Sequence, residues 1–256
     1  MQIRGAMKDW ISHRRTVRKW HRAARMAPGM SLDQLQELRV KARDLHAPIN
    51  QFFTIADGRL SQPLPGSDVF QNPHGTDWAW RPELWRLPLA KPGISSIGNG
   101  TNIGPDVKIF HDCPRSEITI RQLRNRRASD LAPFGLKTEV FAFEGSFLSL
   151  VLDLPQVAVE GLQARHLIRL DAIIELEKPM KLSARLNVRH GPNTVKIIRD
   201  LPQGKPNVMV EFDLAYSDLN ENRLEGAWID LIFEDPAMSQ VILHDLSFSR
   251  RLRAEL

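Results

Sequence analysis

Residues 181–190 read KLSARLNVRH, in which apolar and polar side chains alternate strictly. Such alternation is typical of an antiparallel β-strand that buries only one of its faces. Residues 207–214 repeat the pattern, and residues 226–234, GAWIDLIFE, are apolar on both faces apart from Asp230. The last of these segments therefore predicts a central strand that is covered on both sides.

Turn-forming residues separate these segments between about residue 136 and residue 250. The sequences HGPN (190–193) and PQGKP (202–206) lie between two alternating segments, where turns are expected. Strands in close succession without helices between them predict a mainly β fold, an antiparallel β-sandwich of jelly-roll type. The residues expected in its core include Leu186, Phe212, Trp228, Ile232 and Leu246.

The chain has 256 residues, which is enough for a large hydrophobic core. Its composition predicts three parts: a basic helical hairpin (1–48), an ordered strap rich in Trp and Pro (49–105) and the β-sandwich (106–256). The single cysteine, Cys113, excludes an intrachain disulfide and suits a reducing compartment. There is neither a membrane-spanning apolar run nor a secretory signal pattern, so we expect a cytoplasmic protein that is free or peripheral at the membrane.

The positive charge is concentrated at the N-terminus. Residues 1–26 contain eight basic residues and one acidic residue, a charge of +7. The whole chain carries +5, so the remainder carries −2. Residues 6–27 predict a helix that ends at Pro28-Gly29. Ser31 is expected to cap a second helix, with Gln34 as its capping-box partner, and Pro48 is expected to end it.

The first helix allows three interpretations. Its apolar stripe, which includes Trp10, Val17 and Trp20, could pack within the protein while the arginines remain solvated. A basic amphipathic helix with tryptophans also suits the surface of an anionic membrane. Nucleic acid or another polyanion is the third option, but no nucleic-acid-binding motif accompanies the charge. The candidate contact residues are Arg14, Arg15, Arg18, Lys19, Arg22 and Arg25.

Residues 56–105 contain seven of the 17 prolines, which excludes long helices and most uninterrupted strands. Large apolar residues such as Phe70 argue against a disordered linker. We expect an ordered strap across the sandwich, with residues 94–97 pairing at its edge.

The strap contains the segment DWAWRPELW, residues 77–85. Indole rings beside charged groups suit a sugar, which offers C–H groups for stacking and hydroxyls for hydrogen bonds. The same aromatic residues also suit a strap that anchors itself to a sheet by burial. The candidate ligand-binding residues are Trp78, Trp80, Trp85, Arg81, Asp77 and Glu83.

Motifs for catalysis or metal binding are weak. His111 and Cys113 are two residues apart, but a buried structural thiol is the simpler interpretation. No motif for a metal or a cofactor is recognised, so none is expected. A glycosidase needs two carboxylates. The candidates on or beside predicted strands are Glu211, Asp213, Asp230, Glu234 and Asp245, with Arg185 or Arg189 as an expected partner of Asp230.

Residues 226–251, GAWIDLIFEDPAMSQVILHDLSFSRR, resemble the end of a carbohydrate-binding-module or galactose-binding-like jelly roll. The whole chain, including WRPELW (80–85) and FHDCPRSEITIRQLRN (110–125), is similar to a bacterial family of unknown function. The resemblance to the jelly roll implies non-catalytic binding of a glycan-type ligand. The alternatives are a carbohydrate-active enzyme with paired carboxylates and a structural protein tethered to a membrane or polyanion.

Overall fold

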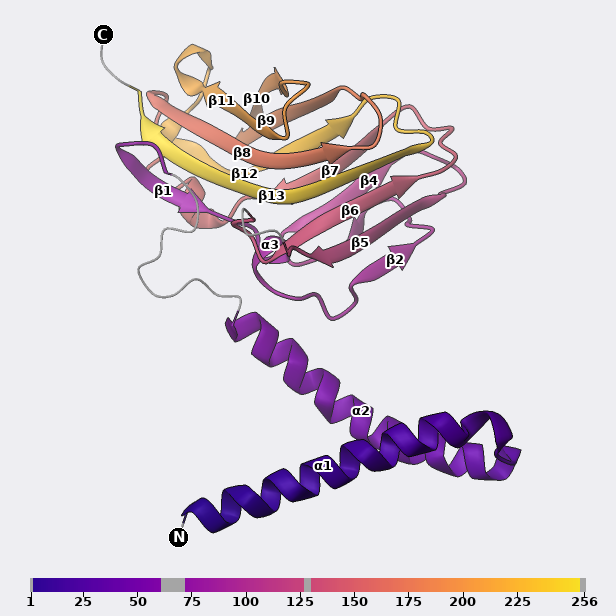
Figure 1. Ribbon diagram of the computed structural model, residues 1–256. Coiled ribbons are helices and arrows are strands. Elements are labelled where there is room, and N and C mark those ends of the chain that lie inside the picture. The colour runs from indigo at the N-terminus through magenta and orange to yellow at the C-terminus, as the bar shows by residue number, and fades with distance from the viewer. Residues whose placement is uncertain (1, 61–71, 127–129, 254–256) are drawn as a thin grey trace. The chain divides into compact units, whose positions relative to one another are not determined.

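A computed structural model describes residues 2–60, 72–126 and 130–253 of the chain; the side chains of residues 2–13, 50, 51 and 53–60 lie outside the description. The predictions for Trp10 and Phe70 therefore fall outside the described side chains. The chain divides into two compact units, residues 1–55 and residues 56–256. The first unit is helical and the second is a β-sandwich (Figure 1).

The sandwich consists of two antiparallel sheets, as the alternation predicted. Sheet A has the order β11-β8-β13-β6-β5-β2, and β1 pairs with β13. Its strands are β1 (Thr76–Trp80), β2 (Gly93–Ser95), β5 (Ile118–Arg124), β6 (Phe134–Val140), β8 (His166–Leu176), β11 (Asn207–Asp213) and β13 (Ser239–Leu252).

Sheet B has the order β10-β9-β12-β7-β4-β3, so the strand predicted to be central, β12, lies inside the sheet. Its strands are β3 (Thr101–Asn102), β4 (Val107–His111), β7 (Leu148–Asp153), β9 (Leu182–His190), β10 (Asn193–Asp200) and β12 (Leu224–Phe233). Three short 3-10 helices lie in connections between strands: η2 (Gln156–Ala158), η3 (Leu214–Tyr216) and η4 (Glu221–Arg223).

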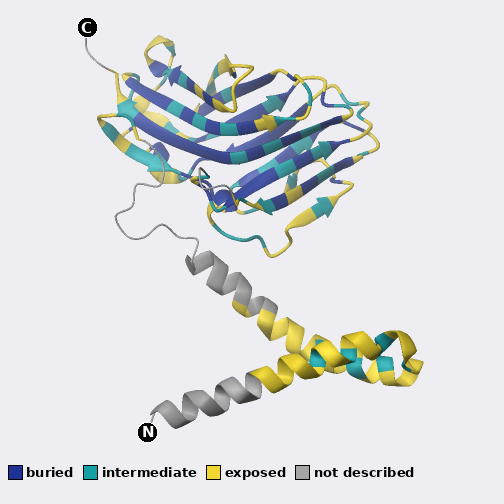
Figure 2. Cartoon of the chain, viewed as in Figure 1, coloured by how far each residue is buried: buried dark blue, intermediate teal, exposed yellow. Residues whose placement is uncertain are grey.

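The hydrophobic core lies between the sheets (Figure 2). Leu186, Phe212 and Leu246 are completely buried there, as predicted. The prediction was wrong for Trp228 and Ile232, which are only half-buried. They lie on the outer face of β12, whose inner face consists of Ala227, Ile229, Leu231 and Phe233. Both faces of this strand are apolar, so periodicity alone could not identify the inner one.

The strap is ordered where it is described. Strand β1 joins sheet A beside β13, and β2 pairs with β5 through Ile94 opposite Ile120, which confirms the predicted edge pairing. Between them, the single-turn helix α3 (Glu83–Arg86) places Leu84 and Trp85 in the core without measurable exposure. Burial of these two side chains explains how a proline-rich segment keeps a defined path.

The first unit contains α1 (Gln2–Met26), the 3-10 helix η1 (Ala27–Gly29) and most of α2 (Leu32–Leu60). The backbone N–H of Gln34 donates to Ser31 Oγ at 3.4 Å, so Ser31 caps α2 as expected. Pro48 lies inside α2, and the prediction that it ends the helix was wrong. A proline removes one backbone donor and crowds the preceding turn, but helix can continue on both sides of it. Neither helix, over its described residues, is apolar enough to span a bilayer.

Candidate ligand-binding groove

The structure corrects two of the six ligand-binding candidates in the strap. The indole of Trp85 is completely buried, and its Nε1–H donates to the backbone oxygen of Leu243 at 3.0 Å. Arg81 is 4% exposed and donates two hydrogen bonds to the carboxylate of Asp245, at 2.8 and 2.7 Å. Both side chains fasten the strap to β13. Their burial and their internal hydrogen bonds occupy the groups that a ligand would need.

The remaining candidates in the strap also make contacts within the sandwich. Trp78 and Trp80 are half-buried and stack on each other, and Trp80 stacks on Phe248 with ring centroids 5.7 Å apart. Asp77 accepts a hydrogen bond from Arg250 at 3.0 Å. Burial acts to raise the pKa of Asp77, but the hydrogen bond and charge of Arg250, together with the charge of His166 and a backbone hydrogen bond, leave the pKa lowered. Glu83 is exposed, and its backbone N–H donates to Asp106.

A more open site lies on the outer face of sheet B. It is a groove of about 560 Å³, called here the sheet B groove, formed by residues of β4, β7, β12, β9 and β10 and by Phe147 just before β7. Its floor is continuous sheet, because these five strands are neighbours in the sheet order. The lining residues are Lys108, Phe110, Phe147, Ser149, Val151, Asp153, Arg185, Asn187, Lys196, Trp228, Asp230 and Ile232.

Strand register arranges these side chains in rows across the sheet. One row runs Lys196, Asn187, Trp228, Asp153, with each residue paired to the next on the neighbouring strand. Neighbouring strands are about 4.8 Å apart, so the row is about 14 Å long. The next row runs Arg185, Asp230, Val151, Lys108. The groove therefore presents an aromatic ring in a row of polar groups, beside a second row that carries both charges and an apolar side chain.

Asp230 organises the polar part of the groove. Its side chain is 6% exposed, and Oδ2 accepts hydrogen bonds from Arg185 Nε at 2.7 Å and from Asn187 Nδ2 at 2.9 Å. This confirms Arg185 as the expected partner of Asp230. Arg185 itself is 37% exposed, so the pair joins a buried carboxylate to a cation that reaches solvent. A second pair, Lys108 with Asp153 at 2.6 Å, lies at the opposite side of the groove.

Three aromatic side chains complete the lining. Trp228 and Phe110 are half-buried, and Phe147 is 43% exposed. No hydrogen bond is found for the indole N–H of Trp228 among the described residues, which leaves this donor available to a ligand. Trp228 was predicted to lie in the core, but one feature of the sequence indicated that its side chain lies on the outer face of the strand. Asp230 is two residues away on the same face of the strand, and a charge marks the face that avoids the core.

The other candidate chemical groups make contacts within the protein. Cys113 Sγ lies 3.0 Å from the backbone oxygen of Arg115, whereas the ring of His111 contacts two backbone groups, the N–H of Cys113 and the oxygen of Ile97. The thiol is thus a buried structural group, as predicted. Each of the five candidate carboxylates pairs with a cation, and they are spread over both sheets. No cluster that could hold a metal is found in the described part of the chain.

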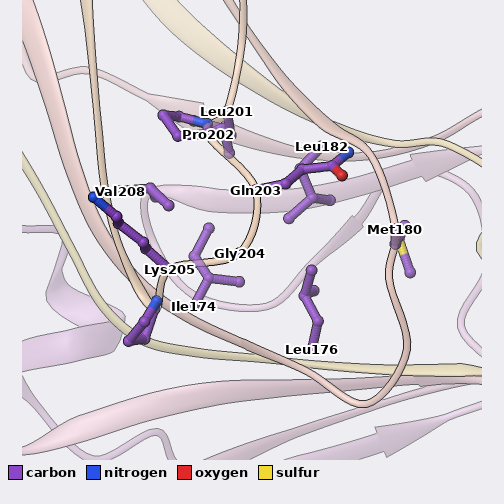
Figure 3. Close-up of a pocket in the computed structure, with 11 residues that line it drawn as sticks. Ile174, Leu176, Met180, Leu182, Leu201, Pro202, Gln203, Gly204, Lys205 and Val208 are labelled. Atoms are coloured by element: carbon purple, nitrogen blue, oxygen red, sulfur yellow. The ribbon is translucent and has the colours of Figure 1, made fainter.

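A second pocket lies between the edges of the two sheets, where the loop from β10 to β11 covers the core (Figure 3). It measures about 270 Å³ and is lined by aliphatic side chains such as Ile174, Leu182 and Val208, with Lys205 on the covering loop. An aliphatic lining offers few hydrogen bonds, so this pocket does not suit a polar ligand.

Comparison with solved structures finds proteins whose folds are similar to the sandwich at low sequence identity. A family 11 carbohydrate-binding module from Clostridium thermocellum, in complex with a β-1,3-1,4-mixed-linked tetrasaccharide, is 8% identical (TM-score 0.40; 64% of this chain, 100% of that one). The CBM22-1 xylan-binding domain from Paenibacillus barcinonensis Xyn10C is 13% identical (TM-score 0.34; 64% and 94%). The enzymatically active domain of tailspike protein 4 from bacteriophage CBA120 is 12% identical (TM-score 0.41; 60% of this chain and only 21% of that one).

The comparison with curated proteins gave no match. A family of unknown function, DUF6478, matches residues 1–256. The match covers the helical unit and the sandwich together, and the chain therefore belongs to the DUF6478 family.

Proposed function

We propose that the protein binds a glycan, without catalysis, in the sheet B groove. The observation that carries this proposal is the row containing Trp228, which places an indole between Asn187 and Asp153 on neighbouring strands. A pyranose ring presents C–H groups on its face and hydroxyls around its edge. An indole with polar neighbours at strand spacing matches both parts of such a ligand.

The rigidity of the groove supports the same function. The polar groups lie on internal strands of the sheet, except Lys196, which lies on the edge strand β10. Asp230 is held by Arg185 and Asn187. Side chains that are already ordered lose little conformational entropy when a ligand binds. The length of the row, about 14 Å, suits an oligosaccharide better than a single sugar.

A carbohydrate-active enzyme is the alternative, and Asp153 and Asp230 are the carboxylates that such an enzyme would use here. Asp153 pairs with Lys108 and Asp230 pairs with Arg185. An acid catalyst needs a carboxylic acid that is free to donate its proton to the glycosidic oxygen. Two carboxylates held by cations suit ligand binding better than this proton transfer.

We expect Trp228→Ala to weaken glycan binding at least about 30-fold, which corresponds to about 2 kcal/mol for an aromatic hot spot. The full chain would be screened on a glycan array, and the best oligosaccharide titrated by calorimetry. Tyr216→Ala is the matched control, because Tyr216 is an aromatic residue that is 83% exposed and lies outside the groove.

Equal affinity of the Trp228→Ala and Tyr216→Ala proteins would place the ligand elsewhere and overturn the proposed site. Incubation with the same oligosaccharide, followed by analysis of reducing ends, separates the two functions. Turnover that disappears in Asp153→Asn or Asp230→Asn would identify an enzyme instead of a binding protein.

A further inference from the structure

One side of α1 is strongly cationic. Six basic side chains in the described part of this helix are exposed, and we call them the cationic face: Arg14, Arg15, Arg18, Lys19, Arg22 and Arg25. With 3.6 residues per turn, they fall within an arc of about 140° around the helix. Val17, Trp20 and Ala24 lie outside this arc, so the charge occupies one side of α1.

Little negative charge balances this face. Residues 10–32 contain no Asp or Glu. Across the described residues, no ion pair is found for Arg15, Arg18, Lys19, Arg22 or Arg25. On α2, Glu37 is taken by Lys41. These five cations lie close together and repel one another, and a negatively charged surface would relieve that repulsion.

Two shallow hollows lie along the cationic face. Arg18, His21, Arg22 and Arg25 border one of them, together with Ala24. The other is lined by Arg15, Arg18, Lys19, Arg22, Ala23 and Met26. Each hollow gathers at least three cations around a space that is open to solvent, an arrangement that suits phosphate groups.

We propose that the cationic face docks the protein on the surface of an anionic lipid bilayer. A bilayer offers many phosphates in one plane, so the five cations without an acidic partner can interact with it at once without a specific fit. Met26 lies within the cationic arc and is 52% exposed, and an apolar side chain among cations suits the headgroup region.

Two other occupants fit the observations less well. Outside residues 1–26 the chain has a net charge of −2, so the sandwich adds no positive field of the kind that supports nucleic-acid binding. A second copy would bring a second cationic face, and like charges oppose that contact. The docking proposal is independent of glycan binding, because it uses only residues of α1.

The test is sedimentation of the full-length protein with vesicles of phosphatidylcholine containing about one third phosphatidylglycerol, at about 0.05 M salt. We expect binding that is lost at about 0.5 M salt and on vesicles of phosphatidylcholine alone. Arg18→Glu with Arg22→Glu should lower the partition coefficient at least about 100-fold, since each basic residue contributes roughly fivefold and each new acid repels the lipid.

The matched control is Arg39→Glu with Arg43→Glu, which makes the same change of charge at exposed residues of α2. We expect this control to lower partitioning less than about tenfold, because its charges lie outside the cationic face. Circular dichroism checks that both variants keep their helices. Equal loss of vesicle binding in both variants would show that only the net charge matters, and would overturn the proposal.

Three further results would also overturn it: no binding of the unmodified protein to the anionic vesicles at low salt, tighter binding to duplex DNA than to the vesicles, or lipid-independent dimers that Arg18→Glu with Arg22→Glu dissociates.

Discussion

Replacing Arg81 by methionine should lower the free energy of unfolding by about 3–5 kcal/mol, the usual cost of removing one partner of a buried ion pair. The side chains of Arg81 and Asp245 are 3% and 7% exposed, and two hydrogen bonds join them. Methionine keeps much of the volume of arginine but leaves the carboxylate of Asp245 without its cation. Chemical denaturation of both proteins at neutral pH measures the difference.

The matched control is Arg189→Met. Arg189 pairs with Glu225 on the surface, where the side chains are 56% and 46% exposed, so its loss should cost less than about 1 kcal/mol. The double variant Arg81→Met, Asp245→Leu should recover much of the lost stability, because no unpaired charge remains buried. If Arg81→Met were as stable as the unmodified protein, the buried carboxylate of Asp245 would not need the charge of Arg81.

The effect of pH on this pair follows from the direction of its pKa shift. Burial raises the pKa of Asp245 above its ordinary value, although the charge of Arg81 opposes the shift. A raised carboxyl pKa means that the folded state holds the proton more tightly, so this group's contribution to stability decreases as pH rises through that pKa. Without Arg81 the pKa rises further. The deficit of Arg81→Met should therefore shrink as the pH is lowered and Asp245 takes up a proton.

Phe212→Ala should lower the free energy of unfolding by about 3–5 kcal/mol, because it leaves a cavity between the two sheets. Phe212 is completely buried in β11, opposite Ile168 of β8. Met209→Ala is the control on the same strand, since Met209 is 43% exposed and should cost much less. If both substitutions cost the same, the strand's inward face is not the one that contains Phe212.

Several parts of the fold were predictable because they depend on residues close together in the sequence. Alternation placed Leu186 and Phe212 inside the sandwich and marked β11 and β9 as strands. The cap at Ser31 and the edge pairing at Ile94 also followed from local patterns. Even the partner of Asp230 was among two predicted candidates, because a buried charge requires an opposite one.

The candidate site was not predictable in the same way. A cluster of tryptophans in the strap suggested a stacking surface, yet Trp85 is buried and Trp80 stacks on Phe248, which is 168 residues further along the chain. Trp228, in contrast, looked like a core residue and lies in the groove. An aromatic side chain gains from burial and from ligand stacking alike, so its identity does not reveal which role it has.

The sequence by itself determined the two-sheet β-sandwich and the concentration of charge in the first helix, because alternation and charge are properties of neighbouring residues. Only the tertiary structure decided which face of β12 is open and which cations meet which carboxylates. Lys196, Asn187, Trp228 and Asp153 form one row although they come from four strands. Strand order and register bring them together, and both depend on contacts between residues that are far apart in the chain.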